Sequence, residues 1–429
     1  MHLRSCFVLL CLAVGLAAAE TTPTFSANDL DRARGMLGLA RDEVVKEFYD
    51  PARVGPEFLA RCRAAHEALA SAKSNDAALM LIAQPFFDIG DSHTRFLPPA
   101  RKDRVQHHWK FHAVGPDIFV SEVDRGSDAE KQGLKVGDQL LSLDGIRPTR
   151  ASRHMLQYLF YHLAPRTGMR VVAQAPGQPP RTLDVRGEIR AGTPLRELRN
   201  DRDRTELELE YENDDERLKS RLVELLNGVL VWKLRQFDPE KIASGLRKVA
   251  SAKAVILDLR GNPGGYVQSA EDVLRGFFAD NFDAYTTHWR KKTETTRIKG
   301  KGYKGLLLVL MDETSASASE IFARTVQMRQ RGILLGDRIA GALSTARYYP
   351  LVLGTAERFI AFGVSITLSS VVMADGSIIE GKGVGPDYQL LPTHEQLYLG
   401  HDPVLAKALT IAGRKTTPEE AGKFFPPLN

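Results

Sequence analysis

A short segment in the middle of the chain joins a strand to a glycine-rich turn. Residues 254–259 read Ala-Val-Ile-Leu-Asp-Leu, an apolar run with the length and β-branched content of a buried strand. Residues 261–265 are Gly-Asn-Pro-Gly-Gly, and residues 270–278 have the apolar spacing of an amphipathic helix. Such a turn exposes backbone N–H groups to a ligand. An ordinary strand-to-helix connection has the same pattern.

The sequence around this unit, residues 228–391, alternates between strand-like and helix-like segments. This alternation predicts an α/β core in which helices pack on a sheet. The chain has 429 residues, which is too long for a single core, so we expect two or three domains. The alternating segments are Val229–Trp232, Ile242–Val249, Ala254–Leu259, Ala270–Phe278, Leu306–Met311 and Ile321–Arg329.

A serine-rich segment precedes the last of these helices. Residues 314–320 read Thr-Ser-Ala-Ser-Ala-Ser-Glu, and an apolar helical run follows at once. Small neighbours let a carbonyl group approach a serine Oγ closely. The helix N-terminus offers N–H groups and positive potential to a developing oxyanion. The segment therefore suits a nucleophilic serine, and it suits equally a helix capped by Ser and Thr.

Three ordered motifs resemble those of serine peptidases of the C-terminal processing (tail-specific) and tricorn core type. The family pattern DLRxNPGG corresponds to Asp258–Gly265, SASASE to Ser315–Glu320, and GxGVxPD to Gly381–Asp387. The resemblance covers roughly residues 228–391 and implies a ClpP/crotonase-like protease core.

The resemblance also implies roles for individual residues. Ser317, the middle serine, would be the nucleophile. The oxyanion donors would be the N–H of Ala318 and that of Gly264 or Gly265.

The general base is where this chain departs from the C-terminal processing peptidases. A serine needs a base to become a nucleophile, and in that family the base is a lysine supported by a glutamine. The register set by Gly336 and Gly341 places Ala342 at the lysine position and Ala346 at the glutamine position. Because both side chains are missing, we expect no Ser-Lys dyad.

In its candidate general base, this chain resembles the tricorn core protease instead. It pairs serine with histidine, with a second serine beside the histidine and a glutamate near the C-terminus. Here Ser92 and His93 lie in Gly-Asp-Ser-His-Thr-Arg, and Glu380 precedes the third motif. The resemblance implies that His93 takes the proton of Ser317 and that Ser92 and Glu380 orient it. A histidine in such a turn is otherwise a hydrogen-bonding loop residue, and Lys382 is a weaker candidate base.

Residues 101–190 have the pattern of a small β-rich domain. Gly133–Gly145 (GLKVGDQLLSLDG) resembles a PDZ domain, with a strand at Ile118–Val123 and a helix at Ala151–Leu163. PDZ domains bind chain ends by adding a strand to a sheet edge. A Gly-Leu-Gly-Phe-like loop is not evident near Trp109–His112, so a structural or gating role is an equal expectation.

The remaining segments complete a multi-domain α+β and α/β organisation. Residues 1–19 read as a signal peptide, with an apolar part too short to span a membrane, so we expect an exported protein, periplasmic or extracellular. Residues 20–100 read as a helical domain that carries the Ser-His segment. Residues 191–227 read as a connector, and residues 228–429 as the serine peptidase core.

The helical region has three predicted helices. Asn28 and Asp29 cap the first, the second runs through Phe58 and Leu69, and Pro85 and Gly90 end the helical region after the third. Cys62 is the one cysteine left after removal of the leader, so we expect a free buried thiol rather than a disulfide.

The composition argues against several classes of partner. The net charge is only +5, and no basic stripe with interleaved aromatics indicates nucleic acid binding. His107, His108 and His112 surround Trp109, but no cysteine or carboxylate completes a metal set, and a solvated strand is the simpler interpretation. We expect neither metal nor cofactor, and peptides or unfolded proteins as partners.

The sequence leaves three functions open. The first is an exported serine peptidase that acylates Ser317 with His93 as base. The second is a catalytically inactive member whose PDZ-like domain and groove bind peptides or a partner protein. The third is a different acyl transfer at the same site, because fold and site do not fix the acyl donor.

Overall fold

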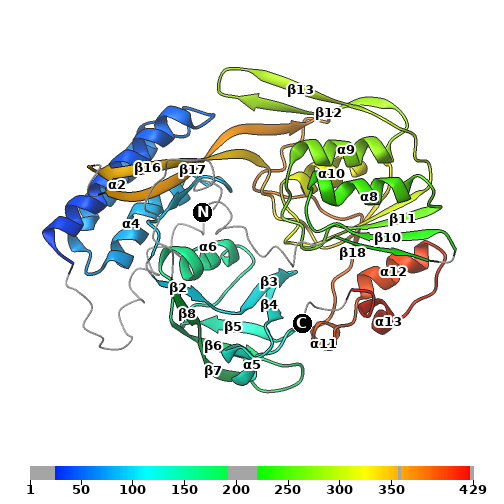
Figure 1. The fold of residues 1–429 in the computed structure, drawn as a ribbon, viewed down its shortest axis with the longest axis horizontal. Coiled ribbons are helices and arrows are strands. Elements are labelled where there is room, and N and C mark those ends of the chain that lie inside the picture. Colours follow the sequence, from blue (N-terminus) through cyan, green and yellow to red (C-terminus); the bar gives the residue numbers. More distant parts are fainter. Residues whose placement is uncertain (1–24, 102, 192–219, 226, 356–358, 426–429) are drawn as a thin grey trace.

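The computed structural model describes residues 25–101, 103–191, 220–225, 227–355 and 359–425. The predicted signal peptide and most of the predicted connector lie outside these ranges. A helical N-terminal region, a small β-rich part and a larger α/β part are arranged side by side (Figure 1). The expected multi-domain α+β and α/β fold class is confirmed.

The α/β part is built on a six-stranded sheet in the order β18-β15-β14-β11-β10-β9. Strands β18 to β10 run parallel, and the edge strand β9 is antiparallel. Parallel neighbours need crossover connections, which the predicted helices supply. The strands are β9 (Arg221–Glu224), β10 (Val229–Lys233), β11 (Ala254–Asp258), β14 (Leu306–Met311), β15 (Ile333–Gly336) and β18 (Tyr388–Gln389).

Helices cover both faces of this sheet (Figure 1). Trp232 and Leu257 pack in one core with α8, α9 and α10, whereas Val231 and Ile256 pack in a second core with α12. Successive side chains of a strand point to opposite faces, so both faces of β10 and β11 must be apolar. The helices are α8 (Pro239–Val249), α9 (Val267–Phe277), α10 (Ala318–Met328), α11 (His394–Tyr398), α12 (Pro403–Ile411) and α13 (Pro418–Gly422).

A second sheet connects the α/β part to the N-terminal helices. Its order is β1-β17-β12-β13, and β16 pairs with β17 in a long hairpin that reaches the blue helices in Figure 1. Because β1 pairs with β17, the residues just before β1 are held against the α/β part. The strands are β1 (Arg95–Leu97), β12 (Asn281–Trp289), β13 (Thr293–Lys299), β16 (Ser344–Gly354) and β17 (Phe359–Met373).

The β-rich part is a five-stranded antiparallel sheet in the order β3-β4-β5-β6-β7, with a separate β2-β8 pair. The predicted strand at residues 118–123 and the helix near residue 155 are both present. The elements are β2 (Asp103–Gln106), β3 (Trp109–Val114), β4 (Asp117–Val123), α5 (Asp128–Lys131), β5 (Gln139–Leu143), α6 (Arg153–Tyr158), a π-helical turn (Leu159–Leu163), β6 (Gly168–Gln174), β7 (Arg181–Arg186) and β8 (Glu188–Ala191).

The predicted cap of the first helix was wrong, whereas the third helix ends at Phe87, between Pro85 and Gly90. Ser26, rather than Asn28 or Asp29, caps the first helix, and the Asp29 carboxylate accepts a hydrogen bond from the Ser26 N–H at 3.0 Å. Pro85 lies inside the third helix, where its burial and that of Phe86 offset the missing N–H. The helices are α2 (Ala27–Glu47), α3 (Pro56–Ala68), a 3₁₀ turn (Leu69–Ser71) and α4 (Asn75–Phe87).

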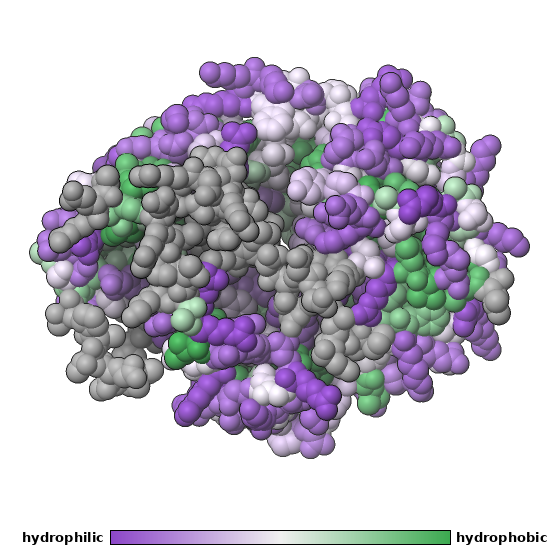
Figure 2. Space-filling model, viewed as in Figure 1, coloured by the Kyte–Doolittle hydropathy of each residue, from purple (hydrophilic) through white to green (hydrophobic). Residues whose placement is uncertain are grey.

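The surface over the described residues is mainly hydrophilic in the view of Figure 2. None of the described helices is both long and apolar enough to cross a bilayer. Cys62 is 2% exposed and free, as predicted, and burial raises the pKa of its thiol to about 12.

Candidate active site

The two motif loops leave neighbouring strands at the same edge of the six-stranded sheet. Strands β11 and β14 are parallel, with Asp258 opposite Leu310, so the loops that follow them must meet. The Ala316 N–H donates to the Asn262 carbonyl at 3.0 Å, and the Ser315 hydroxyl donates to the Leu259 carbonyl at 2.9 Å. The sheet register therefore brings the glycine turn against the serine-rich segment.

Ser317 lies immediately before α10 in a strained backbone conformation. Its φ of 54° and ψ of −116° are unusual for a residue with a side chain. Its N–H donates to Glu320 Oε2 and to the Ala342 carbonyl, both at 3.0 Å. The half-buried hydroxyl is thus presented at a helix N-terminus, where a developing negative charge is favoured.

Gly264 packs directly against the Ser317 side chain. A Cβ at position 264 would lie 2.7 Å from Ser317 Cβ, so only glycine fits there. The Gly264 N–H already donates to Asn262 Oδ1 at 2.8 Å. Gly265 is exposed, and within the described residues neither its N–H nor that of Ala318 has a hydrogen-bond partner. Of the two glycines, Gly265 is therefore the available donor in this conformation.

Ser92 connects His93 to Glu380. Ser92 Oγ lies 2.6 Å from His93 Nδ1, and the Ser92 N–H donates to Glu380 Oε1 at 2.9 Å. The other Glu380 oxygen accepts the Leu343 N–H at 2.7 Å. Residues that are 288 positions apart in the sequence thus form one chain of contacts.

The backbone at residues 342 and 343 links this chain to the serine loop. The Ala342 carbonyl accepts from Ser317, and the next N–H, that of Leu343, donates to Glu380. The expected position of a lysine therefore lies against Ser317, where the alanine side chain offers no base. Among the described contacts, no direct hydrogen bond joins His93 to Ser317, a bond that in many enzymes forms only with substrate present.

Burial lowers the pKa of His93. The negative charges of Glu380 and Asp91 oppose this shift, and the charge of Arg95 adds to it. The imidazole is therefore held in its neutral form, the form that can accept a proton.

Sequence reasoning did not identify Asp91 and Glu320 as site residues. Asp91 Oδ1 accepts the N–H of His93 at 3.1 Å and the N–H of Thr94 at 2.8 Å, which fixes the turn. Burial raises the pKa of Glu320 to about 7, although its carboxylate accepts the N–H groups of Ser317, Gly341 and Ala342. Both residues lie within the quoted motifs, but their partners are distant in sequence.

The remaining candidates are Lys382, which lines a different cavity, and His107, which is buried. Lys382 is exposed and lines, with Arg324 and Arg338, a cavity of about 460 Å³. The prediction of a solvated histidine strand was wrong for His107, which is 5% exposed and packs against Tyr161 with the two ring planes tilted by 37°. Within the described ranges, no three His, Cys, Asp or Glu side chains are grouped to hold a metal.

Comparisons with known proteins identify two parts of the chain. The profile of "Peptidase family S41" matches residues 228–390, and that of "PDZ domain" matches residues 102–160. The carboxyl-terminal-processing peptidase 1 of Arabidopsis thaliana is 24% identical over 351 residues, which are 76% of this chain and 65% of that protein. The carboxyl-terminal-processing protease of a Picosynechococcus strain is 26% identical over 63% of this chain and 64% of its own length. The matches thus span slightly less than two thirds of the length of these relatives.

The fold is shared with a solved structure. A CPAF mutant superposes with a TM-score of 0.66, covering 90% of this chain and 99% of that chain at 14% identity. The mature CPAF complex with lactacystin superposes with a TM-score of 0.62 at 13% identity, covering 86% of this chain and 95% of that chain. The profile matches thus identify a peptidase S41 domain at residues 228–390 and a PDZ domain ahead of it at residues 102–160, and the similar proteins include carboxyl-terminal-processing peptidases.

Proposed function

We propose that this protein is an exported serine peptidase that cleaves peptide bonds in unfolded proteins or peptides. Ser317 forms the acyl-enzyme, His93 is the general base, and no lysine takes part in the proton transfer. The observation that carries the proposal is the contact chain from Glu380 through Ser92 to His93. A histidine held in this way has one nitrogen engaged and one left for the nucleophile.

The steps of the proposed peptide hydrolysis depend on which nitrogen of His93 carries the proton. With the proton on His93 Nδ1 and directed at Ser92 Oγ, Nε2 is free to accept the Ser317 proton. The Ser317 oxygen then attacks the carbonyl carbon, and the N–H groups of Ala318 and Gly265 stabilise the oxyanion. His93 returns the proton to the leaving amine, and a water molecule releases the acyl group by the same steps in reverse order.

The absence of a side-chain base at position 342 supports a histidine rather than a lysine mechanism. Ala342 contacts Ser317 through its backbone, and Lys382 lies on the exposed rim of a separate cavity. Oriented carboxylates are characteristic of histidine bases, since they stabilise the imidazolium that forms. Glu380 meets this requirement through Ser92.

Covalent labelling with a fluorophosphonate tests the proposal. We expect the parent protein to be labelled at Ser317, with the modified peptide identified by mass spectrometry. His93→Ala should slow labelling strongly, and Ser317→Ala should prevent it. Folded parent protein that resists the reagent while binding unfolded peptides would instead indicate an inactive, peptide-binding member. Labelling of His93→Ala at the parental rate would place the base elsewhere, with Lys382 the next candidate.

A further inference from the structure

The outer edge of strand β3 in the PDZ domain is occupied by the peptidase domain. Strand β3 ends its sheet, and its odd-numbered residues direct their backbone groups away from β4. The Ala113 N–H donates to Glu313 Oε2 at 3.1 Å, and the Gly115 N–H donates to Asp337 Oδ2 at 2.9 Å. Two carboxylates of the peptidase domain thus take the donors with which a bound peptide would pair.

Helix α6 and the turn after it engage the acceptors along the same edge. Gln157 Nε2 donates to the Phe111 carbonyl at 3.1 Å, and the Tyr161 hydroxyl lies 3.5 Å from the Trp109 carbonyl. Strand addition at β3 would have to break these bonds as well as those to the carboxylates. In this conformation β3 therefore holds the two domains together.

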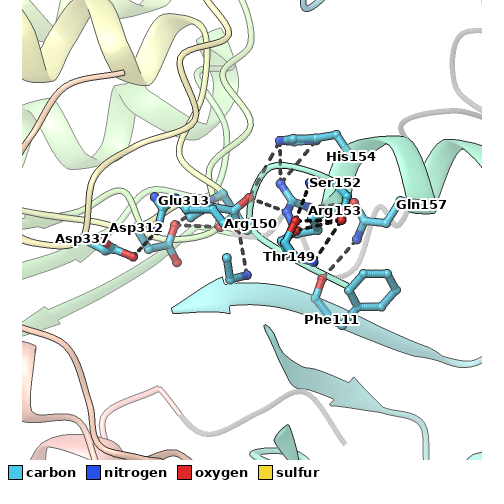
Figure 3. Close-up of polar contacts among 12 residues, drawn as sticks. Phe111, Thr149, Arg150, Ser152, Arg153, His154, Gln157, Asp312, Glu313 and Asp337 are labelled. Carbon is cyan, nitrogen blue, oxygen red and sulfur yellow. Dashed lines mark hydrogen bonds and ion pairs between the residues drawn. The ribbon is translucent and has the colours of Figure 1, made fainter. Parts of the chain in front are cut away.

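A buried ion pair joins the two domains at this edge (Figure 3). Arg153 of α6 donates from Nε to Glu313 Oε1, and the two side chains are 6% and 3% exposed. The other Arg153 nitrogens donate to Gln157 Oε1 at 2.6 Å and to the His154 ring at 2.7 Å. Every arm of the guanidinium is engaged, so the position of the Glu313 carboxylate is closely set.

Glu313 lies four residues before Ser317, in the loop that leaves β14. The preceding residue, Asp312, accepts the Gly261 N–H at 3.2 Å and the Thr314 hydroxyl at 2.7 Å, which ties the loop to the glycine turn. The pair to Arg153 holds the same loop from the PDZ side. The loop is thus clamped between the two domains just before the nucleophile.

We propose that Arg153 is a positioning residue for the peptidase reaction, which it serves by holding Glu313 and thereby the loop that presents Ser317. This inference rests on the proposed function, because it assumes that Ser317 reacts. A small displacement of a nucleophile lowers the rate of the chemical step far more than it weakens substrate binding, because attack requires near-contact geometry. Loss of the pair should therefore lower kcat and leave KM nearly unchanged.

The test compares single and double variants in the full chain. Arg153→Met alone leaves the buried Glu313 carboxylate without its partner and lowers the free energy of unfolding. The double variant Arg153→Met with Glu313→Gln removes both charges, while the amide oxygen still accepts from Ala113, so its melting temperature should return toward that of the parent. We expect its kcat on casein, and its fluorophosphonate labelling rate at Ser317, to stay at least about tenfold below the parent, with KM within about twofold.

The control is Arg170→Met, which breaks an exposed pair with Asp184 in the same domain, with side chains 67% and 69% exposed. It should leave kcat, labelling and melting temperature unchanged. A double variant that is folded and cleaves at the parental rate would overturn the inference while the proposed function stands. A folded parent that neither cleaves nor is labelled would overturn both.

Discussion

At the residue scale, the proposed mechanism depends on the charge of one imidazole, that of His93. Burial holds the pKa of His93 below its usual value of 6.5. As the pH falls below 6.5, His93 binds a proton in the unfolded chain but not in the folded protein. The folded state therefore loses stability in this pH window. In the same window His93 remains neutral in the folded protein and keeps its capacity as a base.

We therefore expect the acid limb of kcat/KM against pH to lie below pH 6.5. The measurement is peptide hydrolysis across pH 4 to 8, with stability checked at each point. Glu380→Gln should move the limb to still lower pH, because the Glu380 charge raises the pKa of His93. A limb at or above pH 6.5 in the parent would show that another group is the base.

Gly264 is a second test at this scale. A Cβ there would lie 2.7 Å from Ser317 Cβ, and φ is +115°. We expect Gly264→Ala to lower the labelling rate at Ser317 by at least about 100-fold, since a displacement of about 1 Å at a reacting atom costs this much.

The matched control for that change is Gly376→Ala. Its φ of +81° imposes comparable strain, but nothing lies within 4 Å of the added Cβ. It should lower the free energy of unfolding by about 1 kcal/mol and leave the labelling rate at Ser317 unchanged. Equal labelling of both variants would contradict the close contact between the two loops.

Motifs in the sequence predicted local geometry better than contacts between distant segments. Ser317 and Gly264 lie in compact motifs whose local geometry depends on neighbouring residues. The contacts of Asp91 and Glu320, by contrast, depend on segments that only the tertiary fold brings near. His107 was misjudged because a histidine among polar neighbours gives no sign of burial against Tyr161.

The helices and strands predicted from apolar spacing are present in the structure, and they differ from the predicted ones mainly at their ends. The predicted helices and parallel strands of residues 228–336 are present because each buries a continuous apolar face. The hairpin of β16 and β17 was not predicted. Most of the residues in β16 are partly exposed, so its apolar alternation is weak.

Helix α2 offers a prediction on an element. Gly38 lies within the helix, and an added Cβ would meet nothing within 4 Å. Gly38→Ala should stabilise the protein by about 1 kcal/mol, because alanine loses less backbone entropy in a helix. Gly35→Ala is the contrast, because its Cβ would lie 2.9 Å from Leu353 Cδ1. Thermal unfolding that shifts equally for both variants would contradict the packing of α2 on β16.

One buried core joins the N-terminal region, the PDZ domain and strand β17, whereas the six-stranded sheet has two cores of its own. One cluster of buried side chains includes Phe86 and Phe96 from the N-terminal region, Phe160 from the PDZ domain, and Phe362 from β17. Phe96 and Phe362 are 5.9 Å apart between ring centroids. The sequence indicated three separate parts and could not predict this shared core, since each contact joins distant segments.

We expect these parts to unfold in a single transition. Because the N-terminal region, the PDZ domain and β17 share one core, removing one of them would expose apolar side chains of the others and lower their stability. Differential scanning calorimetry measures this, with the fluorescence of a variant that keeps Trp109 as its one tryptophan as a local probe of the PDZ domain. Coincident transitions are the expected result, and a PDZ transition well below the calorimetric peak would refute the shared core.

The most direct measurement is casein hydrolysis by the purified mature chain beside Ser317→Ala and His93→Ala. The mechanism predicts cleavage by the parent and a loss of roughly 10³-fold or more in each variant, with all three proteins folded. Cleavage by His93→Ala at a rate close to that of the parent would contradict the histidine base. A folded parent that cleaves nothing would contradict the peptidase assignment itself.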